Sequence, residues 1–160
     1  MVDVAVVDID DDNIRQAINK VFEKTVDGEK LIRSSGEVYV KPNGIDFKPF
    51  THTDSLVLEG VIEYFYEIGA TQVFVMENST QANVTRLVFE VTGYKEVCKS
   101  TGAKSIYLDE QPAASVQLEH IEEAVAFPKI LVKKLIEERE ENTYVNVPKL
   151  KTHSMSTITL

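Results

Sequence analysis

The sequence predicts an α/β domain of the doubly wound, Rossmann-like type, built on a mostly parallel sheet. Two observations lead to this prediction. Short runs of β-branched and aromatic residues alternate with segments whose apolar residues follow the helical period. The segments between successive strands are also long enough for a helical crossover, which parallel strands require. Residues 1–160 together are expected to form a single domain.

The first predicted unit is a strand over residues 2–9 followed by a helix. The side chains of Asp11, Asp12 and Asn13 can cap this helix at its N-terminus. After them, apolar residues recur with the spacing of one helix face, at Ile14, Ala17, Ile18, Val21 and Phe22. Gly28 is expected to end the unit.

The second unit starts with a strand over residues 37–40. This strand is expected to stop at Pro42, which has no amide hydrogen for the sheet, and at the Asn43-Gly44 pair, which favours a turn. Asp54 then caps a helix that runs to Gly69. The next strand is predicted over residues 72–76.

The remaining chain continues the same alternation. Helices are predicted over residues 84–91, 94–100 and 129–141, and strands over residues 105–108 and 143–147. Residues 114–118 and 124–127 are expected to form a hairpin or an edge pairing. The β-branched run over residues 156–160 is expected to be an interrupted strand. The sequence therefore predicts a domain that is truncated at its C-terminal side.

The composition argues against several classes of function. The formal net charge of −9 disfavours a nucleic-acid or an anionic membrane partner, because both need a basic face. No apolar run approaches the ~18 residues of a membrane span, and no secretory signal begins the chain, so a cytoplasmic protein is expected. Cys98 is the only cysteine, which leaves no thiolate set for zinc or an iron–sulfur cluster. No metal site is predicted.

The candidate binding residues follow from the predicted sheet. Open parallel sheets bind ligands at the carboxyl ends of their strands, where loops and helix N-termini gather. The polar residues expected to bind a ligand there are Lys41, Asn43, Ser79, Thr80, Lys149 and Thr152. Lysines, hydroxyls and backbone amides suit a phosphate or a carboxylate.

Lys151 and His153 are the catalytic candidates. A lysine provides a point charge for an oxyanion, and a histidine exchanges a proton near neutral pH. Burial among neighbouring lysines is expected to lower the pKa of such a group and make it a usable base. The alternative is that the lysines are solvated loop residues, that His153 is a structural donor, and that Ser79 belongs to a helix cap.

The segment Val145-Asn-Val-Pro-Lys-Leu-Lys-Thr-His-Ser-Met resembles the family known as domain of unknown function 362. Three further stretches resemble that family in the same order: Val38-Tyr-Val-Lys-Pro-Asn with the helix to Gly69-Ala70, Thr92-Gly-Tyr with Gly102-Ala103, and Leu108-Asp-Glu. The resemblance spans about residues 37–160. Relatives are often joined to a ferredoxin-like 4Fe-4S module, which implies an association with iron–sulfur chemistry. This chain has no ligands for such a cluster, and its cofactor stays open.

Together these features predict an uncharacterised domain that binds a small anionic ligand at the carboxyl edge of the sheet, as part of a redox-linked enzyme. The alternative is a non-catalytic module that uses the same edge to dock an iron–sulfur or other protein partner, and a homo-oligomer is also open. In a third interpretation the lysines only hold a following part of the protein. The substrate, the reaction and whether the chain is an enzyme are not determined at this level.

Overall fold

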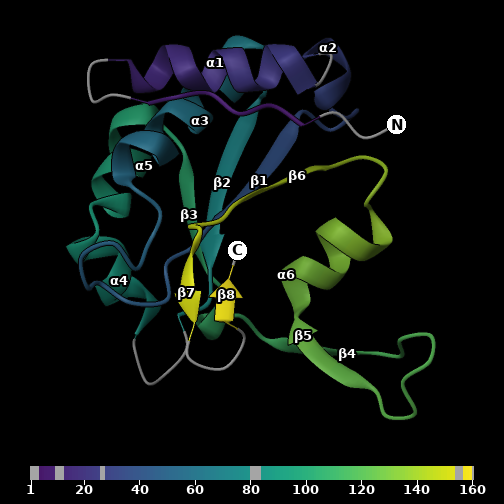
Figure 1. Cartoon of the computed structure of the whole chain (residues 1–160). Coiled ribbons are helices and arrows are strands. Elements are labelled where there is room, and N and C mark those ends of the chain that lie inside the picture. Colours follow the sequence, from purple (N-terminus) through teal and green to yellow (C-terminus); the bar gives the residue numbers. More distant parts are fainter. Residues whose placement is uncertain (1–3, 10–12, 26–27, 80–83, 154–156, 160) are drawn as a thin grey trace.

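Four parallel strands form the centre of the molecule. The computed structural model describes residues 4–9, 13–25, 28–79, 84–153 and 157–159. The sheet has the order β3-β2-β1-β6, with strands β1 (Glu37–Pro42), β2 (Gln72–Glu77), β3 (Lys104–Tyr107) and β6 (Thr143–Val147). Every neighbouring pair is parallel, so all four strands end at the same edge (Figure 1). The predicted α/β, Rossmann-like fold is confirmed.

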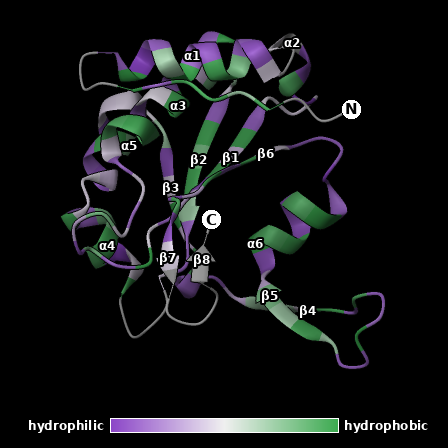
Figure 2. Cartoon of the chain, viewed as in Figure 1, coloured by the Kyte–Doolittle hydropathy of each residue, from purple (hydrophilic) through white to green (hydrophobic). Residues whose placement is uncertain are grey.

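One face of the sheet packs against helices. These helices are α1 (Ile14–Thr25), α3 (Ser55–Glu67) and α5 (Tyr94–Thr101), with the short α2 (Gly28–Leu31) and α4 (Thr85–Val91) beside them. Alternate residues of β1 and β2 point to this face and pack against the apolar side of α3. The buried residues are Val38 and Val40 of β1, Val73 and Val75 of β2, and Leu58, Ile62 and Phe65 of α3. Hydrophobic and hydrophilic residues alternate along α1 as its predicted face requires (Figure 2).

The opposite face is covered by one helical segment. Helix α6 (Lys129–Leu131) continues into a π-helical stretch, Val132–Glu137. Its apolar side chains pack near those of the sheet in a second, smaller core made of Tyr39, Met76, Leu108, Ile130, Leu131 and Leu135. Helices therefore lie on both faces, which is the arrangement of a doubly wound fold.

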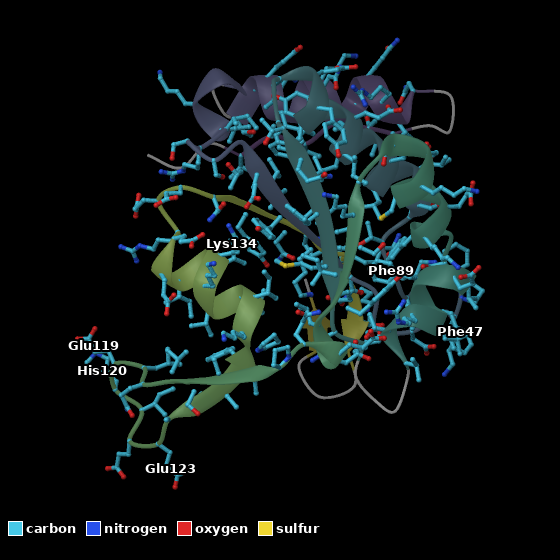
Figure 3. All side chains as sticks on the ribbon, turned by 180° about the vertical axis from the view of Figure 1, so that it is seen from behind. Phe47, Phe89, Glu119, His120, Glu123 and Lys134 are labelled. Atoms are coloured by element: carbon cyan, nitrogen blue, oxygen red, sulfur yellow. The ribbon has the colours of Figure 1, made fainter. Side chains whose placement is uncertain are left out.

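The helix predicted over residues 129–141 is shorter in the structure. The Asn142 side chain donates through Nδ2 to the carbonyl oxygens of Lys134 and Glu138, both at 3.0 Å, and so satisfies the groups that a helix end leaves open. The Lys134 side chain, labelled in Figure 3, forms ion pairs with Glu37 at 3.1 Å and Glu138 at 3.0 Å. These contacts hold the end of the segment against β1.

The strand order reverses at β1. The chain moves from β1 to β2 and β3 on one side and then returns to place β6 on the other side of β1. The paired positions run to the carboxyl ends of both strands, where Lys41 lies opposite Asn146 and Pro42 lies opposite Val147. Such a reversal opens a crevice beyond the strand ends, which is where open α/β sheets bind their ligands.

A hairpin projects from this body. Its strands β4 (Ala113–Val116) and β5 (Val125–Pro128) are antiparallel, as one of the two predicted alternatives requires. The labelled side chains of Glu119, His120 and Glu123 lie at its far end, away from the sheet (Figure 3). A second small antiparallel pair joins β7 (Lys151–His153) to β8 (Thr157–Thr159), so the residues after Pro148 are partly strand and not only loop.

The prediction of a strand over residues 2–9 is wrong for the part that the structure describes. Residues 4–9 form no strand, and the Val4 and Val6 side chains are 85% and 87% exposed. Strand propensity alone does not make a strand, because a neighbouring strand must take the backbone hydrogen bonds, and no strand in the described ranges pairs with residues 4–9. Within the described ranges, no helix has both the length and the apolar character needed to cross a bilayer.

Candidate functional site

A buried threonine bridges the chain at the carboxyl ends of β1 and β6. Thr53 is 3% exposed, and its hydroxyl oxygen accepts a hydrogen bond from the Asn43 backbone N–H at 2.9 Å. The same hydroxyl donates to the Val147 carbonyl oxygen at 2.7 Å. The Thr53 hydroxyl therefore bridges the backbones of the two strands just beyond their last paired residues. It fixes the backbone from which the predicted site residues extend.

Lys41 reaches sideways from β1 to the end of β2. Its Nζ lies 2.7 Å from Oε2 of Glu77, and the Glu77 side chain is only 3% exposed. The other carboxylate oxygen, Oε1, accepts from the Gly44 backbone N–H at 3.0 Å. The Lys41 side chain is 35% exposed, so the cation that pairs with this buried carboxylate still faces solvent.

The turn after β1 packs tightly on this pair. A Cβ atom at Gly44 would lie 3.2 Å from Glu77 Cγ and 3.2 Å from Tyr94 Cε2, so any larger residue would have to push both side chains back by a few tenths of an ångström. The Tyr94 hydroxyl donates to the Thr53 carbonyl oxygen at 2.7 Å and contacts the Asn43 carbonyl oxygen at 3.2 Å. These contacts hold Asn43 and Gly44 in one conformation.

Lys151 enters the same site from β7. Its Nζ donates to the Thr51 carbonyl oxygen at 2.6 Å and to Oδ1 of Asn43. Burial, the largest effect, lowers the pKa of Lys151, while the charges of Glu77 and Asp46 act in the opposite direction and Lys41 adds to the lowering. Lys41 and Lys151, which lie far apart in the sequence, thus act on one another at one edge of the sheet.

The other predicted residues differ in how far they take part. Ser79 is 5% exposed, and its hydroxyl donates to the Gly44 carbonyl oxygen at 2.6 Å, which places it behind the turn. Lys149 is half-buried and Thr152 is exposed. In the part of the chain that the structure describes, neither side chain has a hydrogen bond or ion pair. Thr80 lies outside the described residues, and only the backbone of His153 is described.

The far end of the sheet edge is occupied by structural contacts. The Asp109 side chain accepts from the Thr85 backbone N–H at 3.3 Å, and Glu110 pairs with Arg86 at 2.5 Å. These contacts tie the end of β3 to the start of α4. The carboxylates that follow β3 therefore serve to stabilise the fold. The polar side chains that could contact a ligand lie near the ends of β1, β6 and β7.

Sequence reasoning did not include two groups that the structure brings to the site. Glu77 follows directly after a run of strand residues, but its buried position beside Lys41 depends on the pairing of β1 with β2. His52 precedes Thr53, its ring meets Tyr94 edge-on at 6.3 Å between centroids, and its buried Nδ1 has no hydrogen-bond partner among the described atoms. Its place in the loop that follows β1 was the available signal.

The site can attract an anion and exchange a proton, but it shows no metal-ligand cluster. Among the described residues, no group of three or more histidine, cysteine, aspartate or glutamate side chains is arranged to hold a metal ion. Burial lowers the pKa of the Lys151 amine, so this amine releases its proton more readily than an exposed lysine does.

A family model described as "Domain of unknown function (DUF362)" matches residues 38–160. The chain belongs to the DUF362 family. The match runs from β1 through β8 and so includes Lys41, Glu77 and Lys151. No curated protein and no solved structure matches the chain. The DUF362 description assigns no activity, and the function is therefore argued from the geometry of the site.

Proposed function

We propose that this DUF362 chain binds a small anion, a phosphate or a carboxylate, at the carboxyl edge of its sheet between β1 and β6. Lys41, Lys149 and Lys151 provide the positive charge. Asn43 and Thr152 provide polar contacts at the rim. The ligand belongs to a redox-linked reaction in which Lys151 and His153 transfer the proton.

One observation carries this proposal: two lysines from distant parts of the chain meet where the strand order reverses. Lys151 binds Asn43, which follows β1, and Lys41 ends the same strand. Open α/β sheets bind their ligands where the strand order reverses. Lys41, near the end of β1, and Lys151, in β7, lie close to this position. In a chain of net charge −9, two lysines close together at one edge of the sheet give a local positive field that attracts an anion.

The charges inside the site support a monoanion or dianion. Lys41 is already paired with Glu77, so its charge is partly neutralised. Lys151 makes hydrogen bonds to uncharged oxygens of Asn43 and Thr51, and no carboxylate of the described residues contacts its ammonium group directly. An incoming anion would gain most from Lys151, with Lys41 as a second contact if it turns away from Glu77.

The test is binding of inorganic phosphate and of the dicarboxylate succinate, measured by thermal unfolding and by titration calorimetry. At constant ionic strength, the wild-type protein should gain thermal stability with either anion. Lys151→Ala should weaken binding by at least about tenfold, which corresponds to about 1.4 kcal/mol. Lys99→Ala, which changes an exposed lysine on α5, is the control and should bind as the wild type does.

Two outcomes would overturn the proposal. Equal binding by wild type, Lys41→Ala and Lys151→Ala would remove the site from this edge. An absence of any anion effect, together with salt-sensitive binding of a protein partner, would favour a docking module instead.

A further inference from the structure

The edge of the sheet at β6 is open and lies beside an apolar cavity. The cavity has a volume of about 350 Å³ and lies between the sheet and two helices; its apolar lining includes Ile18, Phe22, Val57, Val145, Val147 and Ile9. Strand β6 is one of the two edge strands of the four-stranded sheet, and its outward backbone groups meet no strand in the described part of the chain. An unpaired edge beside apolar surface is a place where a further strand can add.

Residues 4–9 have the character of the missing strand. They follow one another as Val-Ala-Val-Val-Asp-Ile, which is rich in β-branched residues, yet they form no strand. Their exposure has a period of two in its first five positions: Ala5 and Val7 are half-buried, whereas Val4, Val6 and Asp8 are exposed. This alternation is that of a strand with one face toward a core.

We infer that residues 4–9 add to the open edge of β6 as a fifth parallel strand and close the apolar cavity. The segment is already at the right place, because Ile9 lines the cavity together with Val147 and Pro148. With Ile9 beside Val147, Val7 lies beside Val145 and Val6 beside Tyr144. Apolar side chains of both strands then share the cavity face, since paired residues in neighbouring strands point to the same side.

The connection agrees with this arrangement. Residues 10–13 join the segment to α1, and this length falls within the roughly 2–6 residues of common strand-to-helix loops. Helix α1 would carry the chain from the new strand over β6 to β1, on the face that α3 uses between β1 and β2. Both crossovers move in the same direction along the sheet and on the same face, so they have the same hand, as crossovers in one parallel sheet almost always do.

The first test is a disulfide that forms only in the added-strand arrangement. In a Cys98→Ser background, Val6→Cys is combined with Tyr144→Cys, whose side chain is 48% exposed. Neighbouring strands place such a pair about 5 Å apart, within the range that a disulfide spans. The control combines Val6→Cys with Leu87→Cys on α4, where the side chain is 50% exposed. Oxidised glutathione is the oxidant, and products are separated without reductant.

The expected result is a cross-linked monomer that forms at least about tenfold faster with Tyr144→Cys than with Leu87→Cys. Equal rates in the two pairs would overturn the inference. Cross-links that join two chains would also overturn it, because they would assign the strand to a second copy. Amide hydrogen exchange of the unmodified protein gives an independent answer: every second amide of residues 5–9 should be protected by pairing with β6, and a segment in which no amide is protected would contradict an added strand.

Discussion

The carboxylate of Glu77 and the ammonium group of Lys41 lie 2.7 Å apart at the ends of two neighbouring strands. The Glu77 side chain is buried, whereas the Lys41 side chain is 35% exposed. Only the lysine of this pair is therefore accessible from solvent. Glu77 also accepts from Gly44 and therefore links the turn after β1 to the end of β2. An anion that binds Lys41 must compete with this carboxylate.

Glu77→Gln is expected to weaken the fold and strengthen anion binding. The amide keeps the shape and can still accept from Gly44, but it loses the charge that pairs with Lys41. We expect a loss of about 1–3 kcal/mol in the free energy of unfolding, measured in urea. Phosphate should bind about three- to tenfold more tightly, because the Lys41 charge is released. Glu90→Gln, which breaks an exposed pair with Lys95, is the control. A Glu77→Gln variant that loses phosphate binding would contradict the competition between Glu77 and ligand.

Lys151 should make stability rise with pH in the alkaline range. Burial lowers its pKa in the folded state, so between that lowered pKa and the ordinary lysine range the unfolded chain binds more protons at this amine than the folded chain does. The free energy of unfolding therefore increases with pH across this window. In Lys151→Met that increase should be smaller than in wild type, as urea unfolding at a series of pH values would show. Identical pH dependence in the two proteins would exclude a lowered pKa.

Thr53→Val should be strongly destabilising although it preserves the size of the side chain. It leaves the Asn43 N–H and the Val147 carbonyl oxygen without their shared partner at a buried position. The expected cost is about 2–4 kcal/mol in the free energy of unfolding. Thr53→Ser keeps the hydroxyl and should cost less than about 1.5 kcal/mol. Equal losses in both variants would show that the methyl group, and not the hydroxyl bridge, is what matters.

Gly44→Ala should displace the Glu77 and Tyr94 side chains. The added Cβ meets both at 3.2 Å, and both are buried, so neither can move without a cost of about 1–3 kcal/mol. The same change in a Glu77→Ala background should cost less, because one of the two obstructing atoms is gone. Chemical denaturation of the four proteins of this cycle measures the coupling. Additive effects would mean that the turn does not press on Glu77.

Much of the fold could be predicted because local pattern and final structure agree. The helix from Asp54 to Gly69 is an example: Asp54 caps Leu56 through its side chain, and the apolar stripe faces the sheet. The strand ends at Pro42 and Val147 were also predictable, since proline and the turn residues that follow β1 cannot continue a ladder. At residues 4–9 local pattern and structure differ: the run has strand propensity, but no strand of the described structure pairs with it.

By itself the sequence determined the alternation of strands and helices, the parallel sheet and the edge of the sheet at which the lysines lie. Those properties depend on periodicity, caps and turn residues, which act over a few neighbouring positions. Only the tertiary structure decided that Lys41 pairs with Glu77, that Lys151 binds Asn43, and that Ser79 lies behind the turn. Such contacts depend on strand order and on register, and these follow from the packing of the whole core.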